Sequence, residues 1–443
     1  MAEILLTHSN HLYSDRKQVR KMQPYPPLQT LLAAARLREL GYSVALCDVT
    51  LAVSPDDAFQ QAMAEHRPRL VAVIEDNFNF LTKMCLLRNR ELSFRMAAAA
   101  RAAGITAIVN GSDANDHPLE YLRAGFETVI GGEVERALDS IDRLKAGIWR
   151  AEGPITDLDS LPDAAWDLVD MEAYRQAWIE ARGYFSLNVI SSRGCPYRCN
   201  WCAKPVFGSN YHFRSPERVA REMLRLRRDY RADHIWFADD IFALSAQWTR
   251  SFAAEVERLG AAMPFKMQSR CDLMTRDTVS ALRGAGCAEV WMGAESGSQK
   301  VLDAMDKGTR VEQIYEAREN LRRHGIRAGF FIQFGYPGET FDDIEMTIRM
   351  IRETSPDDVG ISVSYPMPGT RFYDRVAAEL GEKVNWRDSD DLSMMFRGTY
   401  STEFYRELAD AVHAEVRGGE PHWDRVYTLE KRSANPALSW ISC

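Results

Sequence analysis

SSRGCPYRCNWC, residues 191–202, contains three of the eight cysteines in this 443-residue chain. Cys195, Cys199 and Cys202 follow the spacing C-x3-C-x2-C. The apolar run at residues 185–190 comes directly before this stretch and predicts a buried strand. The cysteines are therefore expected on the loop that leaves the carboxyl end of a strand, which is where α/β proteins place their chemistry.

Three thiolates on one short loop can bind one face of an iron–sulfur cluster. The next cysteine along the chain is Cys271, so no fourth local cysteine completes the set. The fourth iron would then be open to a cofactor or a substrate. The alternative is a structural zinc site, which usually takes four ligands in two pairs. No second pair occurs here, and His212 is the nearest single candidate.

The cysteine pattern resembles that of the radical S-adenosylmethionine (radical SAM) superfamily. The resemblance implies that Cys195, Cys199 and Cys202 hold a [4Fe-4S] cluster whose open iron chelates the amino and carboxylate groups of S-adenosylmethionine (SAM). Trp201, the aromatic residue before the last cysteine, also fits the family pattern and is expected at the SAM site.

The composition is that of an ordinary globular protein, with 46% hydrophobic and 27% charged residues. The formal net charge of −8 argues against a nucleic-acid-binding protein held by phosphate contacts. Residues 1–7 start a strand without a basic leader, and no run of about 18 apolar residues predicts a membrane span. Eight scattered cysteines in a chain of this length do not make a disulfide framework. We therefore expect a cytoplasmic protein in a reducing environment.

The cysteines outside the motif have a simpler interpretation. Four of them stand in apolar surroundings and are expected to be small buried residues, namely Cys47, Cys85, Cys271 and Cys287. Cys443 is terminal and is interpreted as incidental.

Residues 1–150 alternate between strand and helix signals. The expected strands are residues 4–7, 43–47, 70–74, 105–109 and 128–130. This alternation predicts a doubly wound, Rossmann-like parallel sheet, whose ligands lie across the carboxyl ends of its strands. The absence of G-x-G-x-x-G after a strand leaves a dinucleotide site unsupported.

This first domain resembles the cobalamin-binding domain that precedes many radical SAM domains. The matching features are Pro26-Pro27-Leu28 before an alanine-rich helix, Leu40-Gly41-Tyr42, and Gly131-Gly132-Glu133. The resemblance implies a cobalamin site at the strand ends, made by His8, Asn10, Glu75, Asn77, Asn110, Gly111, Ser112, Gly131, Gly132 and Glu133. The D-x-H-x-x-G motif that supplies a cobalt ligand in many cobalamin proteins is absent, because His117 directly follows Asp116. Many members of the fused family also lack it; the alternative is a domain that only supports the catalytic one.

The remaining chain divides into a connector at residues 151–180, a catalytic domain at 181–375 and a C-terminal region at 376–443. The catalytic domain has expected strands at residues 185–190, 234–237, 265–268, 289–293, 327–334 and 359–364. Alternation alone indicates an α/β fold, and the resemblance implies a partial (β/α)6 barrel. In the C-terminal region we expect a helix from about residue 400 to 416, followed by about 25 loosely structured residues.

Polar residues at the ends of these strands match family positions near SAM. The resemblance implies that two acidic residues meet the amino group, an arginine pairs with the carboxylate, and a glutamate accepts from the ribose hydroxyls or the ammonium group. The implied SAM contacts, besides Trp201, are Asp239, Asp240, Ser269, Arg270, Glu295, Ser296 and Gln333. Taken singly, each also has an ordinary structural interpretation, such as a helix cap for the Asp-Asp pair.

The resemblance implies an enzyme that cleaves SAM reductively to a 5′-deoxyadenosyl radical and functionalises an unactivated carbon. With cobalamin, the implied reaction is methylation. Ring formation or rearrangement is the second candidate. Residues 396–405 resemble the branch with anaerobic magnesium-protoporphyrin monomethyl ester cyclases and hopanoid-associated enzymes, and this resemblance does not choose between methylation and cyclisation. A third candidate from another class is an electron-transfer or scaffold protein.

The expected partners are a small-molecule substrate and a cellular reductant such as flavodoxin or ferredoxin. Aromatic residues near the predicted strand ends suggest an apolar or flat substrate, although aromatic residues also fill protein cores. No residue is singled out as an acid or base.

Overall fold

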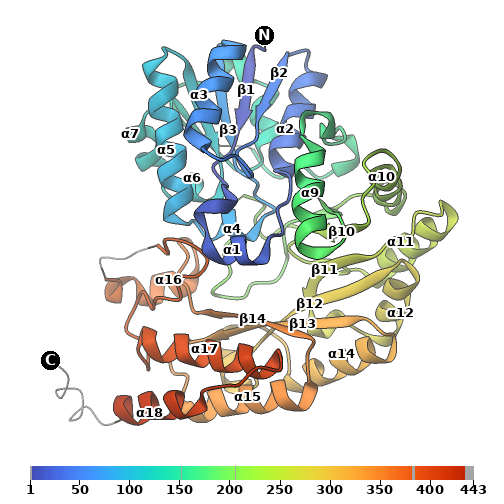
Figure 1. Ribbon diagram of the computed structural model, residues 1–443, viewed down its shortest axis with the longest axis vertical. Helices are drawn as coiled ribbons and strands as arrows, with labels where there is room; N and C mark the ends of the chain where they lie inside the picture. The colour runs from blue at the N-terminus through green and yellow to red at the C-terminus, as the bar shows by residue number, and fades with distance from the viewer. Residues whose placement is uncertain (1, 151, 205, 382–384, 435–443) are drawn as a thin grey trace.

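The computed structural model describes residues 2–150, 152–204, 206–381 and 385–434. It contains two six-stranded parallel sheets and a two-stranded antiparallel ribbon. Figure 1 shows the first sheet and its helices, called here the N-terminal unit, above the second sheet and its helices, called here the barrel unit. Among the helices described, none has the length and apolar character to cross a membrane.

The sheet of the N-terminal unit has the strand order β2-β1-β3-β4-β5-β6. Its strands are β1 (Ile4–Thr7), β2 (Val44–Cys47), β3 (Leu70–Ile74), β4 (Thr106–Asn110), β5 (Thr128–Gly131) and β6 (Gly147–Arg150). The direction of the strand order reverses between β1 and β3, which pair with each other in parallel. This is the switch point at which doubly wound sheets bind their ligands. The predicted Rossmann-like sheet is confirmed, with β6 as a sixth strand that sequence reasoning missed.

Helices cover both faces of this sheet. The larger ones are α2 (Leu28–Glu39), α3 (Pro55–His66) and α5 (Leu87–Ala102), with α7 (Pro118–Ala124) and α8 (Val134–Leu138) completing the layers. One core contains α2 and α8 against Ile4 and Leu6, and the other contains α3 and α5 against Leu5 and Val71. Short helices follow the strands at the carboxyl edge: α1 (Arg16–Lys21), α4 (Phe80–Lys83) and α6 (Ser112–Asp116). In Figure 1, α1 and α4 lie between the two units.

The sheet of the barrel unit has the strand order β14-β13-β12-β11-β10-β7. Its strands are β7 (Ser186–Val189), β10 (His234–Phe237), β11 (Phe265–Arg270), β12 (Cys287–Glu295), β13 (Arg327–Phe334) and β14 (Asp358–Val363). Six parallel strands in chain order form the predicted partial barrel. Its helices are α10 (Pro216–Asp229), α11 (Ala246–Arg258), α12 (Arg276–Gly284), α13 (Gln299–Ala304), α14 (Val311–Arg323) and α15 (Phe341–Thr354).

The connector between the two sheets is docked against both units. It carries helix α9 (Met171–Arg182), which sequence reasoning did not anticipate. Trp178 of this helix is fully buried, and its indole N–H donates to the carbonyl of Pro24 at 2.6 Å. Trp166 is also buried. The connector therefore fixes the two units to each other.

The C-terminal region is more ordered than expected. It contains α16 (Arg371–Val376), α17 (Thr402–Val416) and α18 (Trp423–Ala434). The expectation of a loose tail after about residue 418 is wrong for α18, whose Val426 is buried in the main core. The same expectation for residues 435–443 lies outside the described residues, as does Cys443. The other four scattered cysteines are buried, as expected.

One segment of this region crosses back to the N-terminal unit. Residues 385–391, called here the return segment, contact α1 and α5. The backbone N–H of Ser389 donates to Asp15 at 2.8 Å, and the amide of Gln18 donates to Ser389 Oγ at 2.9 Å. Arg90 donates to Asn385 Oδ1 at 3.0 Å. The N-terminal unit is thus contacted by the connector, which precedes the barrel in the sequence, and by the return segment, which follows it.

Candidate functional site

The three cysteines lie on a loop that is closed at its base by a short antiparallel ribbon. Strands β8 (Ser192–Arg193) and β9 (His212–Phe213) pair at either end of this loop, which is called here the cysteine loop. Gly194 opens the loop with a φ of +79°, and a Cβ there would lie 2.2 Å from the carbonyl oxygen of Asn210. Only glycine combines this backbone conformation with so close an approach.

Side chains within and around the cysteine loop hold its backbone. Lys204 Nζ donates to the carbonyl of Cys195 at 2.8 Å and to that of Tyr197. Asn200 donates from its backbone N–H to Met305 at 3.0 Å and from its amide to Ala304 at 2.8 Å. The loop is therefore fastened to α13 by bonds that involve no cysteine sulfur.

Cys195, Cys199 and Cys202 are all free thiols of intermediate exposure. Burial raises the pKa of the Cys195 thiol and raises that of Cys202 to about 12. A metal that binds these groups must therefore displace protons. The described residues contain no three His, Cys, Asp or Glu side chains grouped to hold a single metal ion. A cluster makes a different demand, because each cysteine binds a different iron, and three free thiols on one fastened loop fit it.

A cavity of about 570 Å3 is lined by residues of both the cysteine loop and the N-terminal unit. Cys199 and Cys202 contribute from the loop, and Asn115 and Asp116 contribute from α6. The rest of its wall is formed by Arg198, Asn200, Ala203, Lys204, Gly208, Ser209, Pro368, Gly369, Thr370 and Arg371. Most of these residues are polar or charged, so the wall does not support the expectation of an apolar substrate. Asn115 Oδ1 is buried without a hydrogen-bond partner and is suited to a ligand with a donor group.

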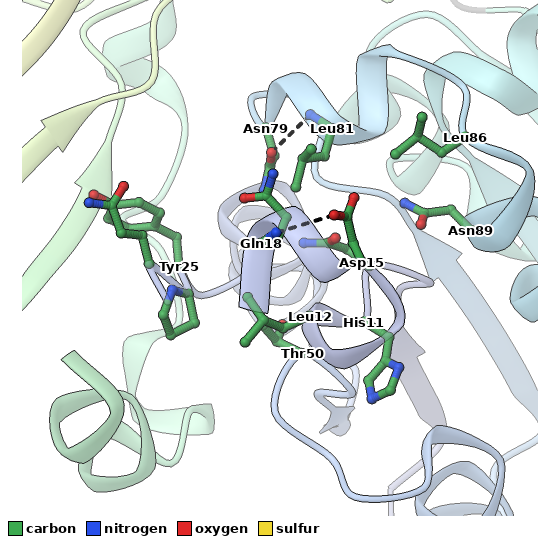
Figure 2. Close-up of a pocket in the computed structure, with 13 residues that line it drawn as sticks. His11, Leu12, Asp15, Gln18, Tyr25, Thr50, Asn79, Leu81, Leu86 and Asn89 are labelled. Carbon is green, nitrogen blue, oxygen red and sulfur yellow. Dashed lines mark hydrogen bonds between the residues drawn. The ribbon is translucent and has the colours of Figure 1, made fainter. Parts of the chain in front are cut away.

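A second, much smaller cavity of about 30 Å3 lies at the end of β1. Figure 2 shows its lining, in which Asp15 accepts from the backbone of Gln18 and Asn79 accepts from that of Leu81. It has room for a water molecule but not for a cofactor. Asn10 is the one predicted cobalamin contact in its wall.

The predicted SAM residues on β10 are bound to other groups of the protein. Asp239 is buried and accepts from Ser191 Oγ at 2.7 Å and from Ser192 Oγ at 2.5 Å. Burial raises the pKa of Asp239 to about 6. Asp240 forms an ion pair with Lys83 of α4. The first aspartate thus fixes the start of the cysteine loop, and the second joins the two units.

The predicted residues on the following strands form a layer beside the cysteine loop. Glu295 pairs with Lys307 at 2.7 Å and has a φ of +60°, which is uncommon for a side-chain-bearing residue. A Cβ on Gly293 would lie 2.5 Å from both charged groups of this pair. Arg270 donates to the carbonyl of Lys307 at 2.9 Å and lies 3.9 Å from Cys199 Sγ. These contacts bring Arg270 and Glu295 together at the second cysteine.

The other predicted SAM residues have local partners. Ser269 Oγ donates to the carbonyl of Phe242 at 2.8 Å, Ser296 Oγ lies 3.1 Å from Thr347 Oγ1, and Gln333 donates to Ser364 Oγ at 3.0 Å. The indole nitrogen of Trp201 is buried without a hydrogen-bond partner.

The predicted cobalamin residues form one hydrogen-bonded edge of the N-terminal sheet. Asn77 accepts from the backbone N–H of Ser112 at 3.0 Å and donates to Asn110 at 3.1 Å. Asn110 in turn donates to the carbonyls of Ile130 and Gly132 at 2.9 Å each. A Cβ on Gly111 would lie 2.7 Å from the Glu75 side chain. The edge is therefore held in one geometry by its own residues.

His8 and Glu75 occupy the part of this edge next to β1. His8 is fully buried and lies 3.0 Å from Asp48, while Asn10 donates its backbone N–H to the other ring nitrogen. Burial lowers the pKa of His8, but the hydrogen bond to Asp48 and the negative charges of Asp48, Glu75 and Asp76 together outweigh it, so the net pKa is raised. Burial raises the pKa of Glu75, which accepts from the backbone of Ser9. Both ring nitrogens of His8 thus have hydrogen-bond partners within the chain, one of them the Asp48 carboxylate.

Glu133, at the same edge of the N-terminal sheet, forms an ion pair with Arg193 at the start of the cysteine loop. It accepts from Arg193 at 2.5 Å, and Glu135 accepts from the same guanidinium at 2.7 Å. Sequence reasoning missed Arg193, Glu135, Lys83 and Lys307. Arg193 stands two residues before the first cysteine, but nothing in its sequence position shows that its partners lie about sixty residues earlier.

Residues 189–351 match the sequence model of the Radical SAM superfamily. An uncharacterized methyltransferase of Pyrococcus horikoshii is 30% identical over 236 residues, which are 53% of this chain and 50% of the relative. The anaerobic magnesium-protoporphyrin IX monomethyl ester cyclase of Rubrivivax gelatinosus is 28% identical over 53% of this chain and 41% of its own length. The chain thus spans about half or less of the length of these curated relatives.

A solved structure resembles nearly the whole fold. It is the radical SAM methyltransferase TsrM of Kitasatospora setae with cobalamin and a [4Fe-4S] cluster bound, which matches with a TM-score of 0.68 and 18% identity. The match covers 85% of this chain and 75% of that one. At this identity the likeness concerns the fold, and it includes the N-terminal unit as well as the barrel. The family match is thus confined to residues 189–351, which are similar to the Radical SAM superfamily, and the likeness over the rest of the chain is one of fold.

Proposed function

We propose that this protein is a radical SAM enzyme that uses cobalamin to methylate an unactivated carbon of a small molecule. The observation that carries the proposal is that Cys199 and Cys202 line the same cavity of about 570 Å3 as residues of α6 in the N-terminal unit. The names of the Pyrococcus relative and of TsrM support methylation.

In this proposal Cys195, Cys199 and Cys202 hold the cluster, and the strand ends of the N-terminal unit hold cobalamin. When bound, the reduced cluster supplies the electron that cleaves SAM, and cobalamin supplies the methyl group. The protein's own residues fix the geometry. Lys204 and Asp239 hold the cysteine loop, while Asn115 and Asp116 line the same cavity as Cys199 and Cys202 and would contact a polar ligand there. The electron donor would be a flavodoxin or ferredoxin, and the compartment a reducing cytoplasm.

Cyclisation is the second candidate, because the Rubrivivax relative is named as a cyclase. The same cysteines would serve either reaction, so the two candidates differ in product rather than in cluster chemistry. An electron-transfer protein would not cleave SAM at all.

The test is an anaerobic reconstitution of the full chain with iron, sulfide and hydroxocobalamin, followed by metal counting and a dithionite-driven assay. We expect about four irons and one cobalt per chain, with release of 5′-deoxyadenosine or S-adenosylhomocysteine. Cys199→Ala should lose iron and SAM cleavage, whereas Cys287→Ala, which changes a buried cysteine in β12, should keep both. Four irons without cobalt would contradict the cobalamin part, and full cleavage by Cys199→Ala would contradict the ligand assignment.

A further inference from the structure

Arg270 has a place in the site that its sequence position does not reveal. It ends β11, is 5% exposed, and its guanidinium carbon lies 3.7 Å from the centre of the Tyr197 ring. Tyr197 stands in the cysteine loop between the first and second cysteines. Arg270 therefore connects the barrel sheet to the loop by a cation–π contact.

The donors of Arg270 can be accounted for one by one. Nε donates to Asp272 Oδ1 at 2.9 Å, and Nη2 donates to Asp272 Oδ2 at 3.3 Å. This uses the side of the guanidinium fork that grips a carboxylate in a bidentate pair. A SAM carboxylate would have to displace Asp272 to take the same place.

The remaining edge points at the second cysteine. Nη1 donates to the carbonyl of Lys307 at 2.9 Å and lies 3.9 Å from Cys199 Sγ, within reach of an N–H···S hydrogen bond. Lys307 is a second buried cation here, but it is balanced by Glu295 at 2.7 Å, as Arg270 is balanced by Asp272. Because the two pairs cancel in net charge, the directed N–H of Arg270 is what acts on the sulfur.

A donor to a ligating sulfur stabilises the more negative, reduced form of a cluster and so raises its reduction potential. We propose that Arg270 is a positioning residue that donates to the Cys199 sulfur and raises the reduction potential of the cluster, and that it does not bind the SAM carboxylate. This inference rests on the proposed function in one respect, namely that Cys199 is a cluster ligand.

The test compares the reconstituted full-length protein with three variants. Arg270→Met removes the donor, and Arg270→Met with Asp272→Asn removes it without leaving a buried carboxylate unpaired. Arg283→Met is the matched control, because Arg283 is an exposed arginine on α12 and belongs to neither the cysteine loop nor the cavity wall. The midpoint potential is measured by anaerobic titration with electron paramagnetic resonance detection, and SAM affinity by equilibrium dialysis.

We expect both Arg270 variants to have a more negative midpoint potential with SAM affinity kept within about threefold, and Arg283→Met to match the unmodified protein. An unchanged potential with SAM binding weakened about tenfold or more would overturn the inference and make Arg270 a SAM ligand. If the Arg270→Met variants do not retain iron, Arg270→Lys gives the decision: a shifted potential supports the inference and an unshifted one overturns it. Failure of the unmodified protein to bind iron would instead overturn the proposed function.

Discussion

The guanidinium of Arg193 donates to Glu135 Oε1 at 2.7 Å, across the boundary between the two units. Arg193 is 3% exposed, stands two residues before Cys195, and also binds Glu133 of the Gly131-Gly132-Glu133 sequence. Its guanidinium lies beside the stacked rings of Phe78 and Phe207, whose centroids are 5.0 Å apart. These contacts thus fix the position of the chain just before Cys195 relative to the carboxyl edge of the N-terminal sheet.

Replacing Arg193 by Met should lower the free energy of unfolding by about 3–5 kcal/mol, because it leaves two buried carboxylates without a cation. Urea unfolding followed by circular dichroism would measure the change. Glu135→Gln is the matched control, since Arg193 keeps Glu133 as a partner. We expect the control to lose clearly less stability, and equal losses in the two variants would contradict this account of the pair.

Under the proposed function, Gly194→Ala should weaken the binding of a cluster by the cysteine loop. The new Cβ would lie 2.2 Å from the Asn210 carbonyl, so the backbone beside Cys195 has to move. Gly208→Ala provides the control on the same loop: Gly208 also has a positive φ, of +67°, but the nearest atom to its Cβ is 3.9 Å away. Iron per chain after reconstitution should fall to less than about half in Gly194→Ala. The fall in iron content should be smaller in Gly208→Ala. Equal iron contents would mean that the contact with Asn210 does not matter.

Glu339 should make the protein less stable as pH rises from about 4.5 to 8. Burial raises the pKa of this carboxyl from its ordinary value of 4.5 to about 8, so in that window the folded state keeps a proton that the unfolded state has lost. Stability therefore falls with rising pH, by at most about 1.4 kcal/mol per pH unit for this one group. Urea midpoints measured every half unit should show a flatter decline in Glu339→Gln. A decline unchanged by the substitution would assign it to other groups.

Asp15→Ala should loosen the contact between α1 and the return segment. Asp15 accepts from the backbone of Lys17 and Gln18 as the N-cap of α1, and it also accepts from Ser389. We expect a loss of about 1–2 kcal/mol, since a cap is typically worth about 1 kcal/mol and a second hydrogen bond is lost with it. Hydrogen exchange in residues 385–391 should become faster.

Asp390→Ala is the companion variant, because Asp390 pairs with Arg20 on the exposed surface of the same contact. Exposed pairs contribute little, so its stability should change by no more than about 0.5 kcal/mol. A larger effect from Asp390 than from Asp15 would show that the surface pair, and not the buried cap, holds the return segment.

Most strands of the two sheets were predictable because they read as short apolar runs between turn residues, and β1, β3, β7 and β10 are buried along their whole length. Strand β6 was missed because it begins at Gly147 and is partly exposed, with Ile148 at 44%. Helix α18 was missed because a Gly-Gly pair and a proline before it suggested a loose tail, while its burial depends on contact with α17.

The three cysteines were predictable from local spacing, but the partners of the charged residues around them were not. Asp239 was expected at a cofactor, and in the structure it accepts from Ser191 and Ser192 at the start of the same motif. Lys83 and Asp240 are 157 residues apart in sequence and meet only because the two units pack together. Such pairs follow from tertiary packing, which periodicity and spacing do not encode.

The bonds that close the cysteine loop join protein atoms to protein atoms. The ribbon β8–β9, the Lys204 contacts and the anchoring of Asn200 to α13 require no metal. Domains whose metal ligands are ordered only by the metal unfold when it is removed. This loop instead keeps its frame, so, under the proposed function, a cluster lost to oxygen could be replaced on the loop without refolding the chain.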